Sequence, residues 1–155
     1  MSIETAKKHL EKYGFADKVI EFDVSSATVE LAAKALKTDG ARIAKTLSFK
    51  LGEEAILIVC AGDAKIDNQK YKARFYAKAK MLTPDEVPQL IGHSVGGVCP
   101  FAINEGIDVY LDESLKRFDV VYPACGSSNS AIGLSIPELE QYSNFKAWID
   151  VCKDW

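Results

Sequence analysis

Several segments of the chain repeat apolar residues at helical spacing, and residues that begin or end helices flank them. Residues 3–13 stop at Gly14, which can adopt the left-handed conformation of a helix end, and the alanine-rich residues 26–36 stop near Gly40. Two later helices begin with a hydroxyl residue three positions before a glutamate, at Thr83 and Ser135, with a proline in the first turn. Helices are therefore predicted over residues 3–13, 26–36, 68–75 and 83–91, and from residue 135 onward.

Runs rich in β-branched and aromatic residues, bounded by turn formers, predict the strands. Residues 42–51 and 54–60 flank Gly52, a pattern typical of an antiparallel hairpin. The tail, residues 145–152, does not distinguish a docked helix from an ordered terminus. Further strands are predicted over residues 18–22, 108–111, 118–124 and 131–134.

The order of these elements predicts the fold class. Too few helical crossovers separate the strands for a doubly wound parallel sheet. We therefore expect one α/β (α+β) domain spanning residues 1–155, with a mixed, largely antiparallel, barrel-like sheet surrounded by helices. At 155 residues, 48% of them hydrophobic, the chain can bury a core without disulfides or metals. No apolar run approaches a membrane span and the first residues lack a secretory signal, so we expect a cytoplasmic protein without membrane contact.

The charge distribution limits which part of the chain could bind a polyanion. Its net charge of −3 argues against a protein that coats DNA or RNA through bulk charge. Residues 65–80, however, hold six basic residues against one acid, Asp67. This stretch is either a polyanion footprint or a solvated helix face, and its basic residues after Lys65 are Lys70, Lys72, Arg74, Lys78 and Lys80.

The cysteines and histidines predict neither a metal site nor a disulfide framework. The four cysteines are far apart, without metal-ligand spacing, so we expect no metal and no cofactor. Cys60 and Cys125 end apolar runs, where cysteine commonly behaves as a small buried hydrophobe. Cys99 has His93 six residues upstream and could be a thiol nucleophile, although that spacing does not position a base.

Lys45 and two glycine-containing loops are the candidate functional residues. Lys45 shares a strand face with Ile43 and Leu47, so its ammonium either faces inward, partly desolvated and ready to bind a phosphate or oxyanion, or lies on the outer face of an edge strand. The loop Gly96-Gly97-Val98-Cys99-Pro100 can present backbone amides to an anion, because both glycines are free to adopt positive φ, or it is a plain turn. Gly126 and Ser127 begin a second polar loop that could contact a substrate or only turn the chain.

Taken together, these segments resemble the YbaK/ProX family of trans-editing aminoacyl-tRNA deacylases, which are related to the editing insertion of bacterial prolyl-tRNA synthetases. The resemblance runs in order over residues 20–139. The segments that carry it are Thr28-Val29-Glu30-x-Ala32-Ala33, Ile43-Ala44-Lys45-Thr46-Leu47, Ala61-Gly62-Asp63, Gly96-Gly97-Val98-Cys99-Pro100-Phe101, Gly126-Ser127 and Pro137-Glu138-Leu139.

The resemblance implies the reaction and the residues that serve it. The family's essential lysine falls on Lys45 and its substrate-contacting loop on residues 96–100. The chain departs from the family at Cys99, often a serine, at Ala102, often a glycine, and in the late loop, where no acid lies between Ser127 and Leu134. These departures bear on the amino acid more than on the reaction.

We therefore predict an enzyme that hydrolyses the ester of misacylated tRNA carrying a small residue such as alanine or cysteine, on proline tRNA by resemblance. Lys45 and Gly97 are the predicted catalytic residues, and Gly96, Val98, Cys99, Pro100, Gly126 and Ser127 the predicted substrate contacts. The basic stretch would bind the tRNA, and an aminoacyl-tRNA synthetase could be a partner. The alternatives are a non-catalytic module that binds aminoacyl-tRNA or a partner, and a thiol hydrolase using Cys99.

Overall fold

The strand β3 (Glu54–Ala61) is the centre of the structure. In the computed structural model, which describes residues 2–155, every residue of β3 after the first is buried. The strand pairs antiparallel with β2 (Ile43–Leu51) through the turn at Gly52, as predicted, and parallel with β5 (Asp108–Asp112). A nearly continuous apolar run is what a strand needs when both faces of its sheet are covered.

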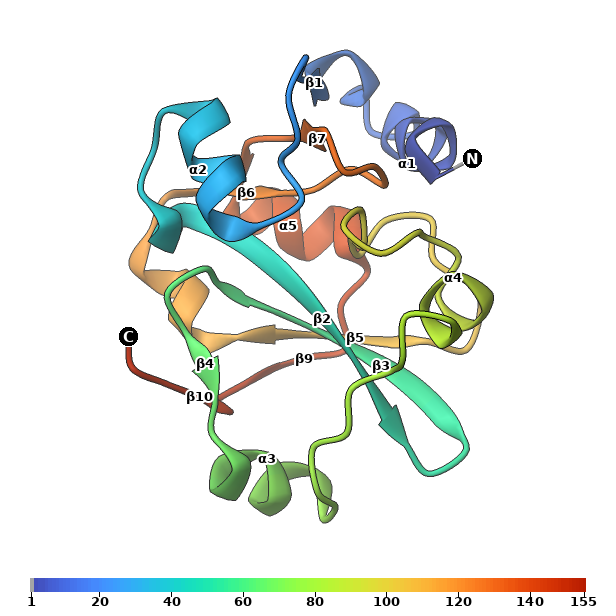
Figure 1. The fold of residues 1–155 in the computed structure, drawn as a ribbon, viewed down its shortest axis with the longest axis vertical. Helices are drawn as coiled ribbons and strands as arrows, with labels where there is room; N and C mark the ends of the chain where they lie inside the picture. The colour runs from blue at the N-terminus through green and yellow to red at the C-terminus, as the bar shows by residue number, and fades with distance from the viewer. Residues whose placement is uncertain (1) are drawn as a thin grey trace.

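The main sheet has six strands in the order β8-β6-β2-β3-β5-β9 and is curled (Figure 1). Parallel pairing joins β6 (Val120–Pro123) to β2 and β9 (Ala147–Ile149) to β5, while β8 (Leu134–Ser135) is antiparallel to β6. Two small antiparallel pairs stand apart, β1 (Ile20–Glu21) with β7 (Ser130–Ala131) and β4 (Lys65–Ile66) with β10 (Cys152–Lys153). The prediction of a mixed, curled sheet in one α/β domain is confirmed.

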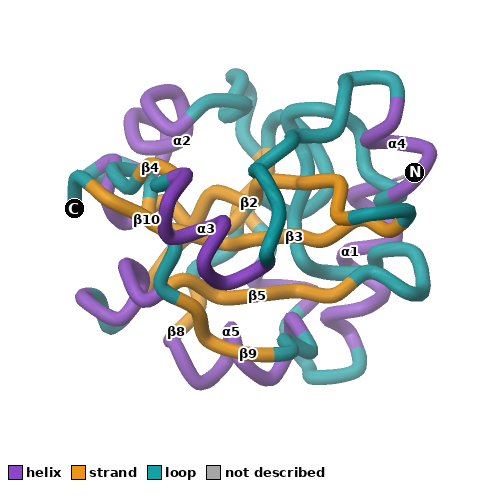
Figure 2. The backbone as a smooth tube through the Cα atoms, turned by 90° about the horizontal axis from the view of Figure 1, so that it is seen from below, coloured by secondary structure: helices purple, strands orange, loops and turns teal. Residues whose placement is uncertain are grey.

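Helices cover both faces of this sheet. The helices α2 (Val29–Leu36) and α4 (Glu86–Leu90) lie on one side and α5 (Ile136–Ser143) on the other (Figure 2). In Figure 1, α1 (Ser2–Glu11) and α3 (Asn68–Phe75) lie at opposite ends of the domain. Short 3-10 helices span Ala16–Lys18, Gly40–Arg42 and Glu113–Arg117. Within residues 2–155, no helix combines the length and apolarity needed to cross a bilayer.

The predicted helix start at Ser135 is correct, whereas the helices predicted from residues 26 and 83 each begin three residues later, at Val29 and Glu86. Ser135 and Glu138 form the reciprocal capping box, and Thr28 accepts a hydrogen bond from the Leu31 amide at 3.1 Å. Thr83 and Glu86 also make their capping hydrogen bonds, yet α4 begins only at Glu86. Prolines at 84 and 88 remove two amide donors from this segment, so the helix is shorter than the predicted residues 83–91.

One predicted strand needs correction, and the tail, left open by its sequence, is extended. The predicted strand 131–134 is two strands, because the chain leaves β7, paired with β1, and joins β6 as β8 after Gly133. The tail contributes the strands β9 and β10. Each of these short strands exists because a distant partner offers a free sheet edge, which local sequence does not record.

Candidate functional site

A cavity of about 300 Å³ opens beside β2, between α2 and the segments 81–87 and 95–98. Its wall is largely apolar, with small hydroxyl side chains at intervals. Among the residues of the described chain that line it, Lys45 is the one that carries a charge. The lining includes the apolar residues Val29, Ala32, Leu47, Val87 and Val98 and the hydroxyl residues Ser26, Thr28, Thr46, Ser48 and Ser130.

The cavity exists because the outer edge of β2 is covered only at its two ends. The strand β6 pairs with β2 only at Ile43 and Ala44. Further along, the chain returns at residues 80–82, where the Lys50 amide donates to the Lys80 carbonyl and the Leu82 amide to the Ser48 carbonyl. Between these two contacts the sheet edge is open, and residues 45–47 line the cavity.

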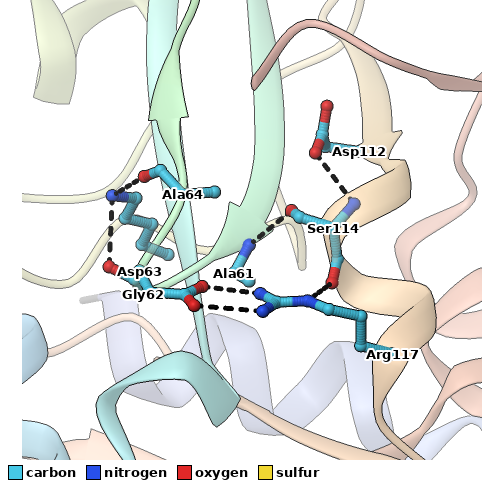
Figure 3. Close-up of polar contacts among 8 residues, drawn as sticks. Ala61, Gly62, Asp63, Ala64, Asp112, Ser114 and Arg117 are labelled. Carbon is cyan, nitrogen blue, oxygen red and sulfur yellow. Dashed lines mark hydrogen bonds and ion pairs between the residues drawn. The ribbon is translucent and has the colours of Figure 1, made fainter. Parts of the chain in front are cut away.

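Lys45 is held in this opening by backbone carbonyls. Its Nζ donates to the carbonyl of Gly62 at 3.4 Å and to that of Ala64 at 2.5 Å (Figure 3). The strand β2 lies between β6 and β3 in the sheet order, but at Lys45 itself it is unpaired on the β6 side, so the lysine lies at a locally open edge that lines the cavity. The side chain is half-buried, and two neutral acceptors leave its positive charge uncompensated toward the cavity.

The two glycine-containing loops meet in space, although 30 residues separate Gly96 from Gly126. Gly97 packs against the second loop so closely that a Cβ there would lie 2.6 Å from the Ser127 nitrogen and 2.7 Å from the Gly126 carbonyl carbon. Gly96 has φ +92, whereas Gly97 does not adopt positive φ, so only one of the two glycines is needed for its conformation. Gly97 is instead needed for its close backbone contact.

Only part of the first loop faces the cavity. Gly96 and Val98 line it, and no hydrogen bond within the described residues uses their amides. The Gly97 amide, by contrast, donates to the Ser94 carbonyl at 3.0 Å. The donors available to an oxyanion in this conformation are therefore the amides on either side of Gly97. Pro100 faces a separate cavity of about 330 Å³ that His9 and Asn104 also line.

The second loop is occupied with its own hydrogen bonds. Ser127 Oγ lies 3.0 Å from Asn129 Oδ1 and 2.8 Å from Ser130 Oγ, and the Cys125 amide donates to Ser130 Oγ. Ser130 is the member of this loop that lines the cavity, while Gly126 and Ser127 support Gly97 from behind. Sequence reasoning missed Ser130, because a run of small polar residues does not show which hydroxyl points inward.

Cys99 lies under the glycine loop, outside the cavity lining. It is fully buried, and burial raises the pKa of its thiol to about 12. His93 lies within reach, with Nε2 3.5 Å from Cys99 Sγ, but the same nitrogen is 2.6 Å from the Phe101 carbonyl, to which it donates. Burial also lowers the pKa of His93. The structure thus brings the two residues together as a packed, neutral pair without access for a substrate.

The structure divides the basic stretch into bound and free residues. Lys70 Nζ donates to Asp150 and to the Cys152 carbonyl, and the Arg74 guanidinium lies over the Phe75 and Tyr110 rings. Lys72, Lys78 and Lys80 are exposed and make no ion pair with any described residue. Of these, Lys78 and Lys80 lead directly into Met81, which lines the cavity.

A partly exposed network that the residue patterns did not predict lies behind Lys45. In the chain, Asp63 lies between Gly62 and Ala64, whose carbonyls accept from Lys45. Its carboxylate accepts two hydrogen bonds from Arg117 (Figure 3). The Arg117 guanidinium holds the pKa of Asp63 below its usual range, so the pair is ionised at neutral pH. Among residues 2–155 no group of three or more His, Cys, Asp or Glu side chains could hold a metal ion.

Comparison with known proteins relates this chain to tRNA-editing domains. Residues 24–142 match the family model described as aminoacyl-tRNA editing domain. The uncharacterized protein YwhH of Bacillus subtilis (strain 168) is 53% identical over 156 residues, which cover 100% of this chain and 99% of that protein. The proline–tRNA ligase of Geobacillus sp. (strain WCH70) is 28% identical over 102 residues, which cover 65% of this chain and 18% of the ligase.

A solved structure agrees with these sequence matches. It is described as a candidate trans-editing enzyme for prolyl-tRNA synthetase, and it superimposes with a TM-score of 0.87 at 29% identity, covering 98% of this chain and 97% of that one. The crystal structure of the hypothetical protein APE2540 has the same fold, with a TM-score of 0.80 at 24% identity over 94% of this chain and 99% of that one.

The contact between the two loops predicts the result of substituting Gly97. In Gly97→Ala, the added methyl group would meet backbone atoms that cannot rotate away, so we expect the free energy of unfolding to fall by about 1–3 kcal/mol. We also expect the amide resonances of Ser127 and Val98 to shift. Denaturant unfolding and amide NMR spectra measure these effects.

Gly52→Ala is the matched control. Gly52 has φ +64 with nothing within 4 Å of a built Cβ, so this variant carries conformational strain without a steric clash. It should lose stability while leaving the Ser127 and Val98 resonances in place. Unchanged resonances in Gly97→Ala would show that the loops do not meet as described.

Proposed function

Because the chain belongs to the aminoacyl-tRNA editing domain family, we propose that it is a deacylase that hydrolyses the ester between a wrong, small amino acid and its tRNA. The observation that carries this proposal is the single ammonium of Lys45, fixed by two carbonyls in the wall of a small apolar cavity. An apolar cavity suits a short side chain, and a fixed positive charge at its wall suits an ester carbonyl that becomes an oxyanion.

The chemistry that these residues support is addition of water to the ester carbon. Lys45 would stabilise the developing oxyanion or orient the terminal nucleotide, and the amides of Gly96 and Val98 are the available backbone donors. The bond from the carbonyl carbon to the ribose oxygen then breaks, releasing the amino acid and a tRNA with a free hydroxyl. No Asp, Glu, His or Cys lines the cavity within the described residues, so positioning and electrostatics would supply the rate enhancement.

The cavity size supports a small amino acid. A volume of about 300 Å³ is at the lower end of ligand-binding pockets, and it must also admit the ribose end of the tRNA. The proline–tRNA ligase relatives support proline tRNA as the carrier. Alanine or cysteine is the amino acid that we propose to be removed, on the family resemblance. Each methylene of difference is worth about 1–3 kcal/mol of discrimination. The proposal puts the protein in the cytoplasm, with aminoacyl-tRNA as substrate and a synthetase as a further partner.

The proposal is tested by incubating the wild-type protein and Lys45→Ala with a panel of misacylated tRNAs and measuring the release of each amino acid. We expect the wild-type protein to release a small amino acid from at least one tRNA, and Lys45→Ala to lose about 3 kcal/mol of transition-state stabilisation, or about a hundredfold in kcat. Lys50→Ala is the control, since Lys50 lies on the same strand but pairs with Glu86 outside the cavity. A folded Lys45→Ala protein with wild-type turnover contradicts the assignment.

Cys99→Ser separates the deacylase from a thiol hydrolase. Since Cys99 is fully buried and its thiol is protonated at neutral pH, we expect the variant to keep kcat within a few-fold of the wild type. No acyl-enzyme should accumulate in either protein, which mass spectrometry of quenched reactions can check. A covalent acyl adduct on Cys99 would establish the thiol mechanism instead.

The free lysines beside the cavity predict how the tRNA is held. In Lys78→Gln/Lys80→Gln, we expect KM for aminoacyl-tRNA to rise and the slope of log KM against log salt to flatten by about one to two, since each lost phosphate contact removes about one released counterion. Hydrolysis of an aminoacyl-adenosine ester, which lacks the phosphates, should be unchanged. Lys12→Gln/Lys18→Gln is the control, because both lysines are exposed and follow α1, which lies at the opposite end of the domain from α3 (Figure 1). If the slope of log KM against log salt is the same in the wild type, the double variant and the control, Lys78 and Lys80 do not contact the tRNA and are only solvated surface residues.

A further inference from the structure

The position of the Lys45 ammonium depends on residues 61–64, a loop that follows β3. This loop supplies both carbonyls that accept from Lys45, those of Gly62 and Ala64. A loop supported only by its own turn would let these carbonyls drift by an ångström or more, and a displacement of that size can lower a reaction rate about a hundredfold. The contacts that immobilise the loop therefore bear on the chemistry at Lys45.

One side of the loop is immobilised by close packing. A Cβ at Gly62 would lie 2.0 Å from the Gly40 carbonyl oxygen, so the two backbones are in direct contact. The Ala61 amide donates to Ser114 Oγ at 3.0 Å, and the Ser114 amide donates to Asp112 Oδ2 at 2.9 Å. These contacts secure the start of the loop against the segment 112–117.

The other side is held by the pair of Asp63 and Arg117. Arg117 Nη1 and Nη2 donate to the two Asp63 oxygens at 3.0 and 2.6 Å, a bidentate geometry that fixes orientation as well as distance. Arg117 Nε donates to the Ser114 carbonyl, so the guanidinium cannot swing away. The guanidinium also lies against two aromatic rings, with its carbon 4.8 Å from the Phe118 ring centroid and 5.1 Å from that of Trp155.

We propose that Asp63 and Arg117, with Trp155 stacked on the guanidinium, are positioning residues that fix the 61–64 loop and through it the direction of the Lys45 ammonium. This inference rests on the proposed function, and it names residues that touch neither the cavity nor the substrate. The pair is partly exposed, with 38% of the Asp63 side chain and 29% of the Arg117 side chain accessible. Exposed ion pairs contribute about 1 kcal/mol or less to stability, so we expect the larger effect of this bidentate pair to be on the geometry of the loop.

The test uses Asp63→Asn and Arg117→Met, singly and together, in the full chain. Each single variant should lower kcat about tenfold while KM stays within twofold and the melting temperature within a few degrees. The double variant should be no slower than the singles, because both substitutions break one unit. Arg117→Lys keeps the charge but cannot make the bidentate contact, so its kcat should fall between those of the wild type and Arg117→Met. Trp155→Ala should lower kcat less than Arg117→Met.

The matched control is another exposed ion pair of similar length. Lys146 Nζ lies 3.0 Å from Asp108 Oδ2, at the end of β5 that is far from the 61–64 loop. Asp108→Asn and Lys146→Met remove this pair in the same way. Both control variants should keep the wild-type kcat.

A second readout follows Lys45 without any substrate. Its ammonium resonance, assigned by its loss in Lys45→Arg, should show slow hydrogen exchange in the wild type because two of its protons are in hydrogen bonds. Asp63→Asn and Arg117→Met should speed this exchange several-fold, and the control pair should not. If the wild type releases no amino acid from any tRNA, the proposed function fails while this readout still decides the inference. Wild-type exchange and wild-type kcat in folded Asp63→Asn would overturn it.

Discussion

Holding one ammonium in the wall of an apolar cavity is the constraint on which the site depends. A lysine there needs acceptors, and a carboxylate would neutralise its charge. The chain solves this with two backbone carbonyls, from Gly62 and Ala64, which bind the ammonium without cancelling it. The acid of this loop, Asp63, is turned away and paired with Arg117. The glycine at 62 follows from the same constraint, because the loop must lie against the Gly40 carbonyl to reach the lysine.

The cavity itself is a consequence of incomplete strand pairing. The edge of β2 is covered by β6 at one end and by residues 80–82 at the other, so the opening lies in the middle of a strand that is rigid at both ends. A gap of this kind keeps residues 45–47 ordered and accessible at once. The helix α2 and the glycine loop then form its walls, and their small side chains keep the space from filling.

The two loops that look alike in sequence have different tasks. The first presents Gly96 and Val98 to the cavity, and the second supports it through the close contact of Gly97 with Gly126 and Ser127. Residues that a resemblance marks as substrate contacts can therefore serve as support one layer behind the surface. Cys99 shows the same distinction, since its burial beside His93 makes it part of the core under the loop.

The sequence by itself determined the features that act over a few residues. The capping box at Ser135 and the hairpin at Gly52 are correct because hydroxyl caps and turn glycines act within three or four positions. The apolar runs also indicated a mixed α/β sheet, and the motif around Lys45 marked the strand that carries the site. Each of these signals is local, so it can be read without knowing where the rest of the chain lies.

Only the tertiary structure decided which distant residues meet. The side on which Lys45 lies was undetermined, because strand alternation gives a face but not the strand's place in the sheet. Arg117 carries no local signal, yet folding brings it to Asp63, 54 residues away, and Trp155 to its face. The split of the predicted strand 131–134 and the strands of the tail also depend on free edges elsewhere in the sheet. Such contacts form only when the whole sheet is assembled, because their partners are far apart in the chain.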